Sequence, residues 1–473
     1  MIVEHYSVDQ GLPNNTVNCT LKDRDGFIWF GTWYGLCCFD GVKFKTFNKQ
    51  EHDSDVPPRK IQRIVEDKNG YIWVKTIDRK LYVFNKVTEC FHAVYDDMKN
   101  YSENIQVIKL QNTAEGDVLL LTKDKNLLLA GVDEKGQVTI KILFDSRDEI
   151  NKHDYTLKHH VLCETEEYIS WIGTDYKVSA VHKGAELASR PADFITSKIN
   201  SGDKDSFTSF FEDGRKVWVG DRAGIFYSID VRTGLVNRYV LSEIKGAISN
   251  LLVTPAGYVY LSVAGQGTYE YDLAERRLQK INTEMNDAMV THAFIDQYDK
   301  IWFHENEKAL IYYDPLNHTA KRFPFTMFGK ITTLYSEDAG ERGLFFLSPA
   351  GEAWLFDREH VEMVYINKLK QLSNDRANQQ FYHLMLDNDG VLWLSSADEG
   401  VYCMNFPKKQ FNLLSLSPQS AGRENYATGV RALFQSKSGD IWVGTRWQSV
   451  YRMDRNGVCL LYTSPSPRDG LLS

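Results

Sequence analysis

The chain lacks the sequence features of membrane-spanning, zinc-binding and nucleic-acid-binding proteins. It has 473 residues and no run of 18 apolar residues, so the sequence predicts no membrane segment. Its seven cysteines are scattered, and no Cys-x-x-Cys pairs with a second one, so we expect unpaired structural thiols and no zinc site. The formal charge of −8, without a Lys/Arg cluster interleaved with aromatics, argues against a nucleic-acid surface.

Short catalytic and cofactor motifs are also absent. The sequence has no phosphate-binding loop of the Gly-x-x-x-x-Gly-Lys-Ser/Thr type, no His-Glu-x-x-His and no Gly-x-Ser-x-Gly. Asp23-x-Asp25-Gly26 resembles half a calcium loop, but Phe27 stands at the next ligand position and the bidentate Glu is missing. We therefore expect no catalytic residue, no metal and no cofactor, and we interpret these carboxylates as parts of hairpin turns.

What the chain does have is an internal repeat. Gly-x-x-Trp recurs in close copies, with their tryptophans at Trp29, Trp73, Trp393 and Trp442. Weaker copies lie between them, and those near residues 119, 260 and 346 lack the tryptophan. The anchors, near residues 29, 73, 119, 171, 218, 260, 302, 346, 393 and 442, are 42 to 52 residues apart. A period of roughly 40–50 residues indicates a repeat architecture.

Each repeat predicts four short antiparallel strands. In the first, residues 16–22 alternate, Asp25-Gly26 turns the chain, residues 27–32 run back, and residues 36–39 and 43–47 follow. Asp-Gly between alternating apolar runs is a strong hairpin signal because these residues tolerate positive φ. Four strands per period predict an all-β fold, a β-propeller of four-stranded antiparallel blades, whereas a solenoid of strands would need a shorter repeat of about 20–30 residues.

The repeated tryptophan has a predicted structural role. Its ring is expected to lie between neighbouring blades and to bury the face of one sheet against the next, which predicts a loss of roughly 3–5 kcal/mol on truncation. We interpret seven of them as core residues: Trp29, Trp73, Trp171, Trp218, Trp302, Trp393 and Trp442.

The division of the repeats into domains leaves alternatives open. We count nine repeat units in residues 1–407, a linker at 408–429, rich in Ser, Pro and Gly at 415–422, and the first blade of a second propeller at 430–459. Propellers usually close at four to eight blades, so we expect a seven-bladed ring. Two weak repeats are then miscounted, the ring closes near residue 325, or the first two blades belong to a neighbouring ring. Residues 3–7 are candidates for an outer strand that closes the ring, and residues 460–473 are interpreted as a non-native tail on a truncated chain.

The opening of the chain is specific enough to compare with a family. Residues 5–17, HYSVDQGLPNNTV, lead into DGFIWFGT at 25–32 and YGLCCFDG at 34–41. This segment resembles the two-component regulator propeller repeats of hybrid two-component sensors in gut Bacteroidetes, and residues 430–445 resemble the same repeat. The resemblance implies a periplasmic sensor region within an inner-membrane protein, followed by a histidine kinase, with a homodimer as the full-length form. The start of the chain does not have the pattern of a signal peptide, in which it departs from the family.

A binding face is predicted from the topology of the blades. The loops between second and third strands emerge at one mouth of the ring, opposite the Asp-Gly turns, and binding residues commonly lie on such loops. Exposed aromatic faces beside charged groups suit sugar rings. The candidate ligand-binding residues are Trp33, Tyr34, Tyr176, Arg222, Arg446 and Trp447.

Three functions remain open on the sequence. The first is a sensor that responds to an oligosaccharide and signals to glycan-utilisation genes. The second is a protein-interaction scaffold. The third is a carbohydrate-active enzyme, since sialidase-type propellers carry Ser-x-Asp-x-Gly-x-x-Trp; here that Asp position holds Arg24, Lys68, Asn388 or Lys437, so we expect no enzymatic activity.

Overall fold

The structure is a computed structural model, and it describes residues 2–47, 57–98, 106–123, 126–144, 162–165, 167–172, 177–184, 194–198, 207–281, 290–305, 308–324, 335–338, 343–348, 352–366, 381–405, 430–438, 440–445, 450–453 and 459–462. These residues form ten antiparallel sheets of four strands each, which confirms the predicted all-β class. The chain divides into a first unit, Met1–Phe406, with nine sheets, and a second unit, Pro407–Ser473, with one.

The nine sheets of the first unit are numbered here in chain order; the strands of sheets 1 to 8 run as consecutive hairpins, and sheet 9 takes its outer strand from the N-terminus. Sheets 1 to 3 contain β2 (Val17–Lys22), β3 (Ile28–Thr32), β4 (Gly35–Phe39) and β5 (Phe44–Phe47); β6 (Ile61–Glu66), β7 (Ile72–Thr76), β8 (Leu81–Asn85) and β9 (Cys90–Ala93); and β10 (Val107–Asn112), β11 (Val118–Thr122), β12 (Leu127–Val132) and β13 (Val138–Phe144). Sheets 4 to 6 contain β14 (Leu162–Glu164), β15 (Tyr168–Ile172), β16 (Lys177–His182) and β17 (Phe194–Lys198); β18 (Phe207–Glu212), β19 (Lys216–Asp221), β20 (Ile225–Asp230) and β21 (Val236–Val240); and β22 (Ile248–Val253), β23 (Tyr258–Val263), β24 (Gly267–Asp272) and β25 (Arg277–Lys280). Sheets 7 to 9 contain β26 (Val290–Ile295), β27 (Ile301–Glu305), β28 (Ala309–Asp314) and β29 (Thr319–Pro324); β30 (Tyr335–Asp338), β31 (Leu344–Leu347), β32 (Ala353–Asp357) and β33 (Glu362–Ile366); and β34 (Phe381–Leu386), β35 (Val391–Ser396), β36 (Val401–Asn405) and β1 (Ile2–Tyr6).

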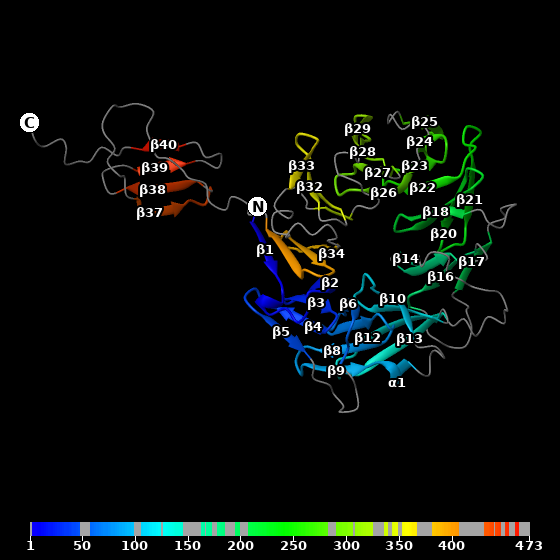
Figure 1. Ribbon diagram of the computed structural model, residues 1–473. Coiled ribbons are helices and arrows are strands. Elements are labelled where there is room, and N and C mark those ends of the chain that lie inside the picture. Colours follow the sequence, from blue (N-terminus) through cyan, green and yellow to red (C-terminus); the bar gives the residue numbers. More distant parts are fainter. Residues whose placement is uncertain are drawn as a thin grey trace, which may run out of the picture. The chain divides into compact units, whose positions relative to one another are not determined.

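The first unit arranges these sheets around a common centre (Figure 1). First strands of neighbouring sheets contact each other, as β2 does with β6 and with β34, so the first strands lie innermost. The fourth strands, such as β9 and β21, lie at the periphery (Figure 1). The first strand of a sheet therefore faces the centre, and the loops at its two ends lie at the two mouths.

Sheet 9 joins the two ends of the first unit. β1 pairs with β36 in antiparallel register, Ile2 opposite Asn405 and Tyr6 opposite Val401. The predicted outer strand near the N-terminus is thus present, at Ile2–Tyr6. A hydrophobic cluster with Phe30 of sheet 1 and Trp393 of sheet 9 then packs the last sheet against the first.

The core lies between the sheets. Each of the nine junctions, from sheet 1 against sheet 2 to sheet 9 against sheet 1, has its own cluster of buried side chains. Trp73 is fully buried in the cluster of sheets 2 and 3, and Trp302 in that of sheets 7 and 8. Trp29, Trp218 and Trp393 are also buried, which confirms their core role.

The number of sheets differs from the seven-bladed expectation. The first unit has nine four-stranded sheets in its described residues, because the repeats without the tryptophan also form complete sheets. Leu119 of sheet 3 and Phe345 of sheet 8 occupy the place of the indole and are buried. An aliphatic or phenyl side chain therefore fills the junction without the recognisable motif.

The second unit contributes sheet 10, made of β37 (Val430–Gln435), β38 (Ile441–Thr445), β39 (Val450–Met453) and β40 (Cys459–Tyr462). Three residues assigned to the non-native tail thus belong to a paired strand, Leu460 to Tyr462. Trp442 is only half-buried, unlike the indoles of the first unit, and the Arg452 guanidinium lies 5.8 Å from its ring centre. The predicted linker 408–429 and the side chain of Trp171 lie outside the described residues.

Helices are few in the described part of the chain. They are a 3₁₀ turn, η1 (Val8–Gln10), and one helical turn, α1 (Tyr95–Met98). Within that part, no helix has both the length and the apolar character needed to cross a membrane.

The Asp-Gly turns are fixed by a buried aspartate that precedes them. Asp23 Oδ1 accepts bonds from the backbone N–H groups of Asp25 and Phe27, and its Oδ2 accepts the indole N–H of Trp29 at 2.8 Å. The same carboxylate–indole bond forms from Asp67 to Trp73, Asp213 to Trp218, Asp296 to Trp302 and Asp387 to Trp393. One side chain therefore satisfies both the turn and the buried indole, which would otherwise leave unpaired donors in the core.

Candidate functional site

Trp33 and Tyr34, the first predicted site residues, form the turn between β3 and β4. The backbone N–H of Trp33 donates to Thr16 O at 3.2 Å, and that of Tyr34 to Thr32 Oγ1 at 3.2 Å. Gly35 completes the turn at a φ of 134°, which an L-residue rarely adopts. The turn is thus fixed by its backbone, while the side chains of Trp33 and Tyr34 are 43% and 62% exposed.

The neighbouring sheet supports the same turn. The backbone N–H of Lys60 donates to Trp33 O at 2.9 Å, and its ammonium lies 5.3 Å from the centre of the Trp33 ring, a cation–π distance. Lys60 O in turn accepts the N–H of Ile77, at the end of β7. The second-to-third-strand turns of sheets 1 and 2 are therefore linked at one mouth of the ring.

Arg222 lies in the corresponding turn of sheet 5, four sheets further along the ring. The buried Asp221 caps this turn by accepting the N–H groups of Ala223 and Ile225 at 2.9 and 2.8 Å, and burial raises the pKa of the Asp221 carboxyl. Arg222 itself is exposed. It shares a face with Trp33 but belongs to a different part of the mouth.

The other predicted site residues are outside the described part of the chain. They are Tyr176, Arg446 and Trp447. The described part of the predicted set consists of Trp33 and Tyr34 at one place and Arg222 at another.

Lys75 is a residue at this mouth that the sequence reasoning missed. It occupies the position that is Gly31 in sheet 1 and Gly220 in sheet 5, and its side chain is 6% exposed. Its ammonium donates to Gln62 Oε1 at 2.7 Å. The available signal was a lysine where other copies of the Trp-x-Gly-Thr pattern have glycine.

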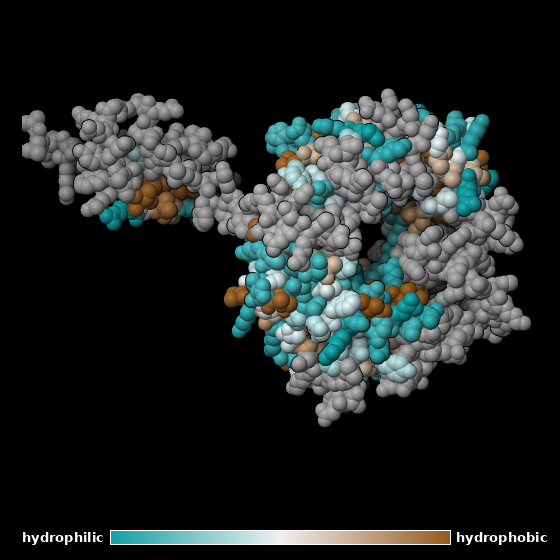
Figure 2. Space-filling view, in the orientation of Figure 1, coloured by the Kyte–Doolittle hydropathy of each residue, from teal (hydrophilic) through white to brown (hydrophobic). Residues whose placement is uncertain are grey.

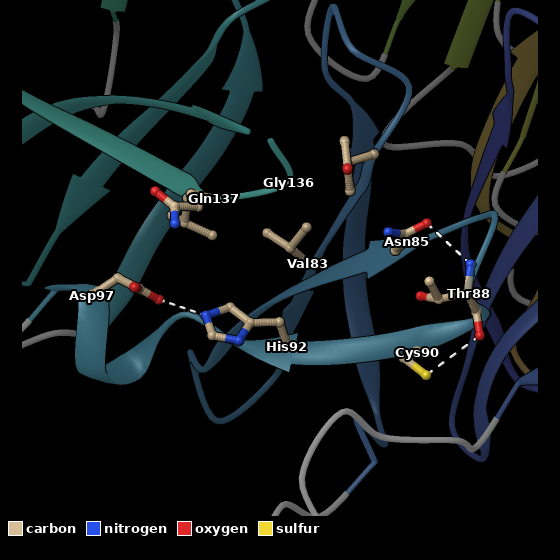
Figure 3. Close-up of a pocket in the computed structure, with 10 residues that line it drawn as sticks. Val83, Asn85, Thr88, Cys90, His92, Asp97, Gly136 and Gln137 are labelled. Atoms are coloured by element: carbon tan, nitrogen blue, oxygen red, sulfur yellow. Dashed lines mark hydrogen bonds and ion pairs between the residues drawn. The ribbon is translucent and has the colours of Figure 1, made fainter. Parts of the chain in front are cut away.

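A polar pocket of about 450 Å³ opens at the outer side of sheets 2 and 3 (Figure 3). His92 of β9 points toward Asp97 of α1, and the His92 Nε2 to Asp97 Oδ2 distance is 2.7 Å. The Cys90 thiol points along the strand in the other direction and donates to Thr88 O at 3.3 Å (Figure 3). The thiol is engaged away from the imidazole, so these two side chains are not arranged as a nucleophile–base pair.

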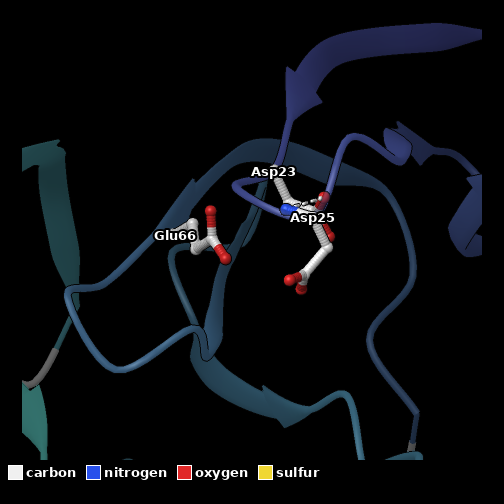
Figure 4. Close-up of side chains that lie close together, drawn as sticks. All are labelled: Asp23, Asp25 and Glu66. Atoms are coloured by element: carbon white, nitrogen blue, oxygen red, sulfur yellow. Dashed lines mark hydrogen bonds between the residues drawn. The ribbon is translucent and has the colours of Figure 1, made fainter.

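Three carboxylates gather at the opposite mouth, Asp23, Asp25 and Glu66 (Figure 4). Lys86 Nζ lies 3.1, 2.6 and 2.8 Å from their oxygens. Although burial lowers the pKa of Lys86, its bonds to Asp25, Glu66 and Asp23 raise it overall, so the ammonium stays charged. The cluster therefore has its own cation and acts as an ion-paired contact between sheets 1 and 2.

The same contact recurs at other junctions. Lys183 Nζ of sheet 4 lies 2.9 Å from Glu115 of sheet 3 and 2.6 Å from Glu164 of its own sheet. Arg358 of sheet 8 pairs with Asp296 of sheet 7 at 2.5 Å and with Asp338 at 2.6 Å. The recurrence indicates that this arrangement holds neighbouring sheets together.

A protein-family model matches the opening of the chain. Residues 11–34 match the family model described as two component regulator propeller. The resemblance read from the sequence is confirmed over these residues, which include Trp29, Trp33 and Tyr34. No curated protein sequence matches the chain.

The solved structures found by comparison include extracellular domains of hybrid two component systems. The extracellular domain of the putative hybrid two component system BT3049 from B. thetaiotaomicron is 15% identical, with a TM-score of 0.33, over 100% of this chain and 67% of that chain. The corresponding domain of BT4673 from B. thetaiotaomicron is 18% identical, with a TM-score of 0.30, over 97% of this chain and 62% of that chain. The Dos1 propeller is 12% identical, with a TM-score of 0.43, over 85% and 93%. The chain thus spans about two thirds of the length of the two extracellular domains from B. thetaiotaomicron.

Proposed function

We propose that the chain is the ligand-sensing, extracytoplasmic region of a hybrid two-component sensor histidine kinase. The observation that carries the proposal is the match of residues 11–34 to the two component regulator propeller, at the segment that forms the first turn of the candidate mouth. In this proposal the region lies in the periplasm as part of an inner-membrane protein, and the kinase belongs to a longer protein.

The proposed ligand is an oligosaccharide. Trp33 and Tyr34 support this assignment because they expose two aromatic side chains on a turn fixed by backbone bonds. Sugar rings stack their C–H faces on such side chains, and fixed aromatics lose little conformational entropy on binding. Arg222, Tyr176, Arg446 and Trp447 remain predicted contacts of the same kind.

Signalling in this proposal is a shift between two arrangements. A ligand changes the equilibrium only by the difference in its affinity for the two arrangements, here the packing of the propeller region against its partner in a homodimer. The downstream kinase would then control glycan-utilisation genes.

We further propose that sheets 1 to 9 form one closed propeller and that sheet 10 begins a second. The pairing of β1 with β36 and the buried cluster at every junction support the single ring. Glu4 lies opposite Cys403 in that pairing, so Glu4→Cys is expected to form a disulfide with Cys403 under mild oxidation. Failure of this cross-link in the folded chain would exclude the closure.

The sensor proposal is tested by calorimetry of the full chain against a panel of polysaccharide digests, with product analysis of the same samples. Binding without turnover is the expected result, and a Trp33→Ala, Tyr34→Ala double variant is expected to lose it. Turnover of any digest would replace the proposal with an enzyme. No heat with any digest would replace it with a protein-interaction scaffold.

A further inference from the structure

The inner wall of the ring has a repeated irregularity in the pairing of first strands with second strands. The register of the first and second strands shifts between the first and third residues of the first strand in seven sheets of the first unit. Such a β-bulge turns side chains out of the ladder. Since first strands lie innermost, these irregularities lie near the centre of the unit, which is hollowed in Figure 2, although Cys19 itself packs into the junction of sheets 1 and 2.

The third residue of the first strand and its partner on the second strand are cationic or neutral in these sheets. They form seven pairs: Cys19 and Gly31, Arg63 and Lys75, Lys109 and Leu121, Ser209 and Gly220, Asn250 and Ser262, His292 and His304, and His383 and Ser395. None of these described pairs contains a carboxylate; at the first residue of the strand, Asp221 and Glu305 stand opposite Phe207 and Val290. The cationic side chains of the seven pairs belong to sheets 2 and 3.

Sheet 2 concentrates this charge. Arg63 and Lys75 lie directly opposite each other on β6 and β7. Like charges in that position destabilise a sheet. The buried Lys75 ammonium bonds to the neutral amide of Gln62. Burial, and then the positive charge of Arg79, lower the pKa of Lys75 to about 8.

The nearest carboxylate on the same turn is engaged elsewhere. Asp78 accepts the Thr76 hydroxyl, and its other oxygen lies 3.3 Å from Lys80. Arg63 is exposed and has no ion pair with a described residue. A buried ammonium beside unneutralised guanidinium groups costs stability, so the arrangement is better explained by a ligand than by the fold.

His383 extends the same wall across sheet 1. Burial, and then the positive charge of Arg63, lower the pKa of His383 to about 4. Its Nδ1 is buried without a hydrogen-bond partner. In the tautomer with a proton on Nδ1, this atom is a donor for an incoming oxygen anion.

The aromatic turn lies at the same end of these strands. Lys60, whose backbone bonds to Trp33 O, is followed directly by Ile61, Gln62 and Arg63 of β6. Asn18 Nδ2 also donates to Ile61 O at 2.6 Å, which ties sheet 1 to the start of β6. Exposed rings and unneutralised cations therefore meet where sheets 1 and 2 reach the mouth.

We propose that this wall binds the carboxylate or sulfate group of an acidic oligosaccharide, with Arg63 and Lys75 as the anion-binding residues and Trp33 and Tyr34 as the surface for its sugar rings. The proposal rests on the proposed sensor function and specifies its ligand class. Guanidinium and ammonium donors form charge-assisted bonds with both groups. Residues 48–56, which include Glu51, Asp53 and Asp55, lie outside the described part of the chain. The test therefore measures the binding of anions to the whole chain.

Calorimetry of the full chain with matched probes tests the proposal. Tetragalacturonate is compared with its methyl ester, which keeps the sugar and removes the charge, and a sulfated disaccharide with its unsulfated form. Stronger binding of a charged probe than of its neutral partner, by roughly 10-fold or more, is expected for one bond to a charged group. The two pairs separate the carboxylate from the sulfate.

Variants locate the site. Arg63→Gln, at an exposed position, is expected to weaken the binding of the charged probe by about 10-fold or more. Lys75→Gly, which restores the residue of other repeats, should do the same if it folds. Lys135→Gln, an exposed cation on the turn after β12, is the control and should leave affinity unchanged.

The outcomes separate this inference from the sensor proposal. Equal affinity for the charged and neutral forms would overturn the anion site and leave the sensor proposal intact. Equal losses of affinity in Arg63→Gln and Lys135→Gln would also overturn it, since the charged probe would then be attracted to any cationic side chain. No binding of either charged probe would overturn it as well, whereas the sensor proposal is decided by the digest panel.

Discussion

Removing the Asp67 side chain is the sharpest test of how the repeat is held together. Asp67 is 1% exposed. Its Oδ1 accepts the backbone N–H groups of Asn69 and Tyr71 at 2.9 and 3.0 Å, and its Oδ2 accepts the Trp73 indole N–H at 2.9 Å and the Val132 N–H at 3.3 Å. The last of these bonds crosses to sheet 3. Asp67→Ala therefore leaves four donors without their acceptor.

The expected loss follows from that count. At about 1 kcal/mol for each donor left without its bond, Asp67→Ala should lower the free energy of unfolding by about 4 kcal/mol. Asp67→Asn keeps one oxygen and should lose about half as much. A domain is stable by only about 5–15 kcal/mol, so the larger change is easily measured.

Asp133 provides a matched control. Its Oδ1 accepts the N–H groups of Lys135 and Gln137 at 2.9 and 2.8 Å in a turn of the same kind, without an indole bond. Asp133→Ala should cost about 1–2 kcal/mol, since this partly exposed turn can bond to water. Urea unfolding followed by tryptophan fluorescence measures both variants. Equal losses would refute the role given to the buried carboxylate.

Three further predictions concern single side chains. Lys75→Met should be more stable than the parent below about pH 8, and the gap, on the order of 2 kcal/mol, should close as pH rises from about 8 to 10.5, because the unfolded chain binds more protons there; a pH-independent gap in urea unfolding would contradict this. Burial raises the pKa of the Cys37 thiol to about 12, so iodoacetamide at pH 8 should label the half-buried Cys90 well before Cys37 in the folded chain, as followed by mass spectrometry; equal rates would contradict it. Lys86→Met should lower the urea midpoint, and millimolar Ca²⁺ should restore part of it, because three carboxylates lose their cation. A variant whose urea midpoint does not change with Ca²⁺ would contradict this prediction.

The repeat was predictable because its signal is local. A turn pair such as Asp25-Gly26 and an indole such as Trp29 lie within one hairpin, and both have the predicted roles. The number of sheets was not, since Leu119 and Phe345 fill the place of the indole through packing volume alone. Packing of this kind leaves no motif in the sequence.

The candidate site was predictable only in part. Exposed aromatics at Trp33 and Tyr34 follow from loop position. The proposed role of Lys75 depends on its position opposite Arg63. A shift in strand register creates this pairing, and the repeat pattern does not predict it. The His92–Asp97 pair depends on a helical turn that interrupts the repeat. Strand register and irregular segments thus determine these parts of the site, and the repeat pattern does not encode them.

The pairing of β1 with β36 has a consequence for biosynthesis. Residues 2–6 leave the ribosome about 400 residues before their partners at 401–405. At roughly 5–20 residues per second, the first strand waits on the order of 20–80 s for its partner. A premature stop codon before residue 401 leaves that strand, and the apolar flank of the first sheet, open to aggregation or proteolysis. Loss of a few residues at this late point is therefore expected to be more damaging than a deletion of equal size in a peripheral loop.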